Sequence, residues 1–202
     1  QTTEFSISAD KYDQNRNFFL SHFFRDNYDR WCSKLPHVTS GVQITRIEVW
    51  VTNKRNNFNE SRNIMAFMDL GEGEERNISN HHWIGVAGSV PQNSSNNLLD
   101  ELETYPNARY MSSVSTALQP LKEAYDFEGG KDYEKIESAR LLSSSEYTLN
   151  SSLGYIMLKT ALASDEILAV AYQYTYNGKP YQVGEFSGDS HSTDESLYVK
   201  ML

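Results

Sequence analysis

Four carboxylates gather around two glycines in the first half of the chain, and such a group could hold a cation. The residues are Asp69, Glu72, Glu74 and Glu75, with Gly71 and Gly73 between them. Oxygen-rich loops with a glycine hinge are typical Ca²⁺ ligands, but this spacing does not match the 12-residue EF-hand loop. We interpret the segment as a solvated acidic turn and keep a calcium loop as the alternative.

Two adjacent histidines invite a second metal hypothesis. His81 and His82 precede Trp83. Adjacent residues of an extended chain point to opposite sides, so both rarely bind one ion, and no third His or Cys stands at a suitable short spacing. We therefore predict that the two histidines are loop residues and that the chain holds no metal.

Nucleophile chemistry has little support. The sequence lacks the G-x-S-x-G, Ser-x-x-Lys and phosphate-loop patterns. The single cysteine, Cys32, could be a thiol nucleophile with His37, but no activating residues accompany it. We expect Cys32 to pack as a small apolar side chain beside Trp31.

A pair of carboxylates is the remaining catalytic possibility. Glu146 and Glu185 could act as hydrolase carboxylates only if the fold brought them within about 5–10 Å of each other. Carboxylates on separate strands are usually exposed, so we predict no catalytic residue and no cofactor.

Tyrosines mark one face of the clearest β segment. Tyr172, Tyr174 and Tyr176 alternate along it, and Tyr181 follows in the next segment. Aromatic side chains on one face of a sheet usually form core. The alternative is an exposed platform for a protein or glycan partner, which makes these four tyrosines the candidate interaction surface.

The tyrosines belong to a predicted β-hairpin. Residues 167–176 and 179–186 alternate in polarity around Asn177 and Gly178, and Asn-Gly is the preferred pair of a type I′ turn. Strands are also predicted at 42–52 and 63–70, as an antiparallel pair, and at 146–149, 154–158 and 197–202.

Four further segments have the residue spacing of a helix. We predict helices over residues 17–24, 98–102, 114–125 and 132–141, the last having the best amphipathic stripe, and keep an apolar strand as the alternative over 17–24. Residues 71–97 are predicted to be an irregular surface excursion that carries Trp83, and residues 187–196 a mobile loop. The expected fold is α+β: a mainly antiparallel β-sheet with a few short helices packed on one face.

Composition narrows the function classes. The 202 residues carry a formal net charge of −9, which disfavours duplex nucleic acid and anionic lipid as partners. No apolar run approaches the roughly 20 residues of a membrane helix. The chain begins at Gln1 without a methionine, and we expect residues 1–202 to be one globular segment excised from a larger protein.

Several long strings resemble one family. They lie at residues 10–16, 18–21, 24–29, 40–53, 62–64, 66–72, 146–148, 153–156, 165–178 and 181–186. In these strings the chain resembles the SprA (Sov) family of Bacteroidota, the outer-membrane proteins of gliding motility and type IX secretion. The resemblance covers nearly the whole chain and is weakest over 73–97 and 188–196.

The resemblance implies a role in protein export. It suggests a non-enzymatic structural or interaction domain of an outer-membrane translocon, with other type IX secretion components or secreted cargo as partners. The segment itself would face the extracellular or periplasmic side without spanning the membrane. It implies no catalytic residue. A glycan- or protein-binding cell-surface module is the alternative.

Overall fold

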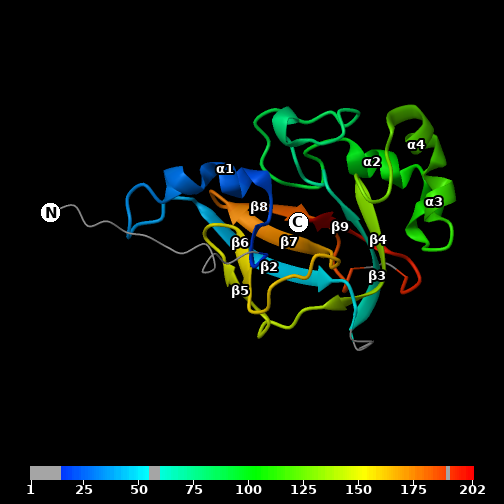
Figure 1. The fold of residues 1–202 in the computed structure, drawn as a ribbon. Coiled ribbons are helices and arrows are strands. Elements are labelled where there is room, and N and C mark those ends of the chain that lie inside the picture. The colour runs from blue at the N-terminus through cyan, green and yellow to red at the C-terminus, as the bar shows by residue number, and fades with distance from the viewer. Residues whose placement is uncertain (1–14, 55–59, 190–191) are drawn as a thin grey trace.

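The computed structural model describes residues 15–54, 60–189 and 192–202, and its regular structure is mostly β with a few short helices (Figure 1). The strands are β1 (Asn17–Phe19), β2 (Val42–Val51), β3 (Ser61–Phe67), β4 (Tyr133–Leu141), β5 (Tyr147–Asn150), β6 (Tyr155–Leu158), β7 (Leu168–Tyr176), β8 (Lys179–Val183) and β9 (Leu197–Met201). The helices are α1 (His22–Trp31), α2 (Leu98–Glu103), α3 (Val114–Ala117) and α4 (Gln119–Tyr125), with 3₁₀ turns at Glu75–Asn77 and Pro106–Arg109.

Five strands close into a ring in the order β2-β4-β3-β9-β7, because β7 pairs with β2 as well as with β9. All of these pairings are antiparallel except β3 with β9, which is parallel. Strand β8 extends the sheet outside the ring by pairing with β7 alone among the strands. The predicted pairing of 42–52 with 63–70 is therefore wrong, since β4 lies between β2 and β3.

Apolar side chains of mixed size fill the inside of the ring. One buried cluster takes residues from all five ring strands and adds Phe186. Four of its members are alanines, namely Ala66, Ala139, Ala169 and Ala171, and they lie in the same cluster as the large side chain of Trp50. Side chains just fill the interior of an eight-stranded barrel, so a five-stranded ring has less room and its large residues need small neighbours.

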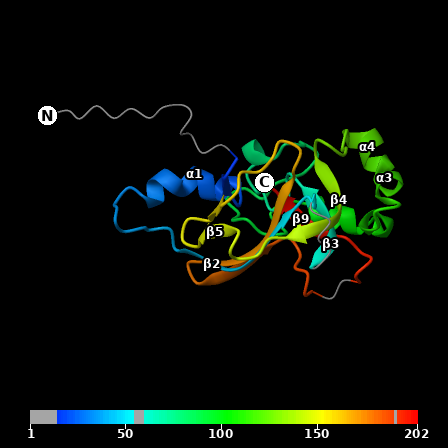
Figure 2. The ribbon, with the colours of Figure 1, turned by 60° about the horizontal axis from the view of Figure 1, so that its bottom comes forward.

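The outer face of the ring carries the larger core. Phe24 and Trp31 of α1 lie in this cluster together with Leu102 of α2 and Leu121 of α4. Figures 1 and 2 show α1 near one end of the ring and α2 to α4 near the other. The helices thus form two groups rather than one layer.

A second sheet lies beside the ring. It has the order β1-β6-β5, and Phe19 of β1 pairs with Tyr155 of β6. The sequence predicts one sheet that includes the strand at 154–158, and this prediction is wrong because β6 belongs to the second sheet. The predicted helix over 17–24 was also displaced: its first residues pair as a strand, and the helix begins after Ser21 and continues to Trp31.

The predicted helix over 132–141 is strand β4. Tyr133 faces the outer core and Ile136 faces the inside of the ring, so both faces of the strand are buried. A bulge then shifts the register, with Ser138 at φ 48°, and returns Ala139 to the inner face. Burial on both faces plus a bulge produces a three-residue apolar spacing that resembles a helix.

The other predicted helices and the hairpin are confirmed. Helices α2, α3 and α4 cover the two remaining segments, and Pro120 lies in the first turn of α4, where proline is tolerated. Asn177 and Gly178 have φ of 50° and 81°, as a type I′ turn requires.

Residues 71–97 contain no strand or α-helix but are not a surface excursion throughout. Trp83 is 3% exposed and packs edge-on against Phe127. Asn93 closes the outer edge of β8, because its backbone N–H donates to the Gln182 carbonyl oxygen and its side chain accepts from the Gly184 N–H. The predicted loop 187–196 lies partly outside the described residues; Arg62 donates to the carbonyl oxygens of Ser187 and Ser192 within it.

Candidate functional site

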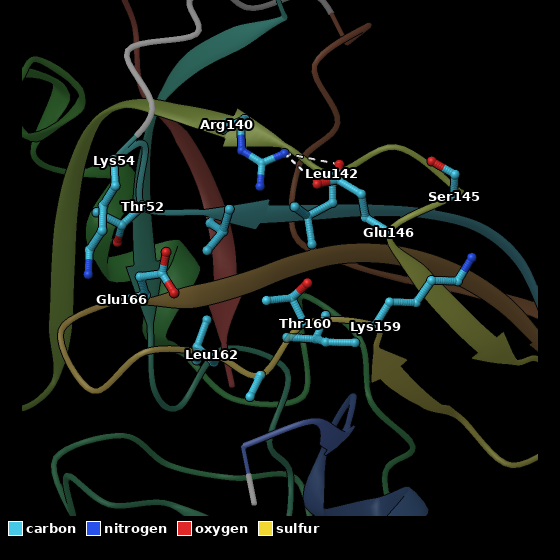
Figure 3. Close-up of a pocket in the computed structure, with 13 residues that line it drawn as sticks. Thr52, Lys54, Arg140, Leu142, Ser145, Glu146, Lys159, Thr160, Leu162 and Glu166 are labelled. Carbon is cyan, nitrogen blue, oxygen red and sulfur yellow. Dashed lines mark hydrogen bonds and ion pairs between the residues drawn. The ribbon is translucent and has the colours of Figure 1, made fainter. Parts of the chain in front are cut away.

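A cavity of about 310 Å³ opens where the ends of β2 and β4 meet the segment that joins β6 to β7 (Figure 3). Its apolar wall consists of Val51, Leu142, Leu158 and Leu162. Its charged residues are Lys54, Arg140, Glu146, Lys159 and Glu166. We call this cavity the β2–β4 cleft.

Arg140 and Glu146 form the best-ordered ion pair of the cleft. Nη1 of Arg140 lies 2.8 Å from Oε1 and 3.0 Å from Oε2 of Glu146. The Ser143 N–H donates to Oε2 over 2.9 Å. Burial tends to raise the pKa of Glu146, but the hydrogen bonds from Arg140 and Ser143 outweigh it and the pKa falls. Glu146 is therefore a carboxylate at neutral pH.

The other charges of the cleft are less completely paired. Lys54 pairs with Asp165. Oε2 of Glu166 accepts the Ala163 N–H over 2.8 Å. Lys159 is exposed and has no described carboxylate within ion-pair distance. Figure 3 shows Arg140 turning one nitrogen toward Glu146 and another toward the open space of the cleft.

A second charged group is buried between α1, β9 and the loop after β3. Lys200 Nζ lies 3.1 Å from Oε1 of Glu72, and their side chains are 4% and 2% exposed. His22 donates its backbone N–H to the same oxygen, and its Nδ1 lies 3.2 Å away. Lys200 also donates to the Met68 carbonyl oxygen. Burial raises the pKa of Glu72, but Lys200 and His22 lower it more, to about 2. We call Glu72, Lys200 and His22 the buried triad after its two buried charges; the His22 side chain is 33% exposed.

The prediction that the acidic turn is solvated is wrong for Asp69 and Glu72, which are both buried. Asp69 is 2% exposed and accepts the backbone N–H groups of Ser79 and Asn80 over 2.7 and 2.9 Å. Glu72 belongs to the buried triad. Both carboxylate oxygens of Asp69 and Oε1 of Glu72 already face donors within the chain, which disfavours the calcium loop.

The histidine and cysteine candidates are not assembled into a site. His82 stacks on Tyr125 with ring centroids 3.3 Å apart, whereas His81 is exposed. Cys32 is half-buried at the end of α1, and His37 is exposed in the turn that follows. Within the described parts of the chain, no three His, Cys, Asp or Glu side chains lie close enough to hold a metal ion.

The two candidate hydrolase carboxylates belong to different ion pairs. Glu146 binds Arg140, whereas Glu185 receives two hydrogen bonds from Arg109 over 2.8 and 2.9 Å. Glu146 lines the β2–β4 cleft and Glu185 does not. The structure therefore does not bring them together in one pocket.

The tyrosine face is largely core. Tyr172 is 0% and Tyr174 is 1% exposed, and the ring of Phe24 in α1 contacts both edge-on. Tyr176 and Tyr181 are half-buried. The predicted interaction surface on all four tyrosines does not fit this burial, because α1 covers the first two.

Sequence reasoning missed the two basic residues that matter most here. The sequence pattern predicts that Arg140 lies in a helix and Lys200 in an apolar strand. A signal existed for Lys200: it is the one charged residue between Leu197 and Leu202. Tyr198 and Leu202, which share its face of the strand, are apolar, and a lysine on a buried strand face needs a buried partner. Which partner it has depends on the tertiary structure.

The fold and its charged groups define a mostly β protein built around a small closed ring, in which the buried charges of Glu72, Glu185 and Lys200 are paired within the chain. The chain belongs to the SprA_N family of motility-related and secretion proteins, whose family model matches residues 1–176. A comparison with curated proteins gave no match. Among the helices that the structure describes, none has the length and apolar character needed to cross a bilayer.

Proposed function

We propose that the chain is a non-enzymatic structural and interaction domain of a type IX secretion translocon in the outer membrane of Bacteroidota, acting in protein export and gliding motility. Membership of the SprA_N family of motility-related and secretion proteins supports this proposal at its coarser level. The finer parts of the proposal, namely the translocon, the outer membrane and Bacteroidota, rest on the resemblance of the sequence to the SprA (Sov) family.

One structural observation carries the non-enzymatic part. The chemically capable groups stabilise the fold: Glu72, Glu146 and Glu185 each bind a basic side chain. The pKa values of Glu72 and Glu146 are lowered, which is opposite to the shift that a carboxyl needs in order to donate a proton near neutral pH. This arrangement favours rigidity over acid–base catalysis.

The alternative, a glycan- or protein-binding module that uses the tyrosines, is less well supported. An aromatic platform must be open to its ligand, and α1 covers Tyr172 and Tyr174. The burial of these two tyrosines therefore favours an interaction surface elsewhere on the domain.

An in-frame deletion of the segment from the full-length protein tests the proposal. We expect export of secreted cargo and gliding to be lost while the shortened protein remains in the outer membrane, because the domain shapes the translocon or docks its partners. The measurements are cargo in the culture medium, motility and the abundance of the protein in membrane fractions. A full-length variant with the exposed Glu75→Gln change is the control. Normal export by the deletion strain would contradict the proposal.

A further inference from the structure

We propose that the β2–β4 cleft binds an acidic polypeptide segment, with Arg140 receiving a carboxylate and the apolar wall receiving a neighbouring side chain. The inference rests on the proposed function in one respect, namely that the ligand of an interaction domain for secretion is a polypeptide.

The charge of the cleft departs from that of the chain. The whole chain has 18 basic and 27 acidic residues. The residues that line the cleft include three basic side chains, Lys54, Arg140 and Lys159, and two acidic ones, Glu146 and Glu166. Two neighbours add one charge of each sign: Asp165 pairs with Lys54, and the Arg16 guanidinium donates to the Lys159 carbonyl oxygen over 3.3 Å. The cleft region therefore has one more positive than negative side chain on an otherwise acidic protein, and such an excess attracts an anion.

Arg140 is held in a position suited to that anion. Both hydrogen bonds to Glu146 use Nη1, and Glu146 is in turn fixed by Ser143. The side chain of Arg140 is 18% exposed, so it is ordered without being sealed from solvent. A guanidinium offers its donors in a planar fork that matches a carboxylate, and pre-orientation lowers the entropy cost of binding.

The rest of the cleft suits a peptide side chain. The apolar wall formed by Val51, Leu142, Leu158 and Leu162 lies in the same cleft as the exposed residues Thr160 and Ala161. A volume of about 310 Å³ is at the lower end of the range for ligand pockets, which suits one or two side chains rather than a folded domain. Glu166 comes from a different wall than Arg140, so it disfavours a second acid and can accept a peptide N–H or hydroxyl.

Titration of the isotope-labelled chain with two short peptides tests the proposal by NMR. The peptides are acetyl-Leu-Glu-Ser-amide and its neutral counterpart acetyl-Leu-Gln-Ser-amide. We expect the acidic peptide to bind with Kd on the order of 1 mM, about tenfold more tightly than the neutral one. Signals of Arg140, Leu142 and Lys159 should shift, and added salt should weaken binding.

Variants locate the site. Arg140→Gln should weaken binding of the acidic peptide about tenfold and Lys159→Gln about threefold, as expected for losing a charge-assisted contact and a more exposed charge. Lys159 is exposed, so its variant is expected to fold normally. Arg76→Gln is the matched control, because Arg76 is exposed and binds Asp26 away from the cleft.

Three results would overturn the proposal: equal affinity for the two peptides, signal shifts confined to other surfaces, or unchanged binding in both cleft variants. Failure here is distinguishable from failure of the proposed function, because the titration measures binding by the purified chain and the deletion measures export by cells.

Discussion

The buried triad and the Arg140–Glu146 pair both join a carboxylate to a basic side chain, but their surroundings differ. Glu72 and Lys200 are almost wholly buried, and one oxygen of Glu72 is shared by Lys200 and His22. Arg140 and Glu146 are 18% and 34% exposed and border an open cleft.

This difference separates two uses of an ion pair. Breaking a buried pair leaves a charge without water or a partner, so Glu72 and Lys200 depend on each other. Water can replace a lost partner at the cleft, and Arg140 can exchange contacts with a ligand. The triad therefore serves the fold, whereas the cleft pair is available for binding.

The largest expected effect is that of Glu72→Gln. The variant keeps an oxygen that can accept the His22 N–H but leaves Lys200, 3% exposed, without its counter-ion. We expect the free energy of unfolding to fall by about 3–5 kcal/mol, measured by urea denaturation. The double variant Glu72→Gln with Lys200→Met, which removes both charges, should recover part of the loss. A single variant as stable as the wild type would contradict the buried triad.

The pH dependence of stability sharpens the same point. The pKa of Glu72 falls from an ordinary 4.5 to about 2 in the folded chain. A lowered pKa means that the stabilisation is complete above about pH 4.5 and is lost as the pH falls toward 2. It amounts to about 3 kcal/mol. The difference in unfolding free energy between the wild type and Glu72→Gln should shrink over this range, because the other carboxyls titrate in both proteins. A difference that is independent of pH would rule out Glu72 as its source.

The smallest expected effect is that of Glu146→Gln at the cleft. Its partner Arg140 can turn to water, so the free energy of unfolding should fall by about 1 kcal/mol. Urea denaturation in parallel with Glu72→Gln makes the comparison direct. A loss as large as that of Glu72→Gln would show that the cleft pair is structural too.

Local patterns predicted much of the secondary structure. The Asn177-Gly178 turn, the alternation of β7 and the short helices near residues 98–125 depend on neighbouring residues only, and the structure confirms them. The local pattern of β4 predicted a helix instead, because its apolar spacing reflects burial on both faces and a bulge at Ser138. The single predicted sheet likewise failed, since the pattern of one strand does not identify its partners.

The candidate site was predicted poorly for a related reason. The sequence drew attention to Glu72, Glu146 and Tyr172 as chemically capable residues, but not to Arg140 and Lys200 as the partners that decide what the two carboxylates do. Glu72 and Lys200 are far apart in the sequence and share no local pattern. They come together because β9 pairs with β3 in the closed ring.

The sequence by itself determined the family, the acidic surface and the positions of most strands and helices, because each depends on composition or on short-range spacing. The tertiary structure alone decided which face of each strand lies inside the ring, that α1 buries Tyr172, and which charges are paired. Ring closure joins β2 to β7 and β3 to β9 across more than a hundred residues of chain, and contacts at such separations depend on the packing of the whole domain.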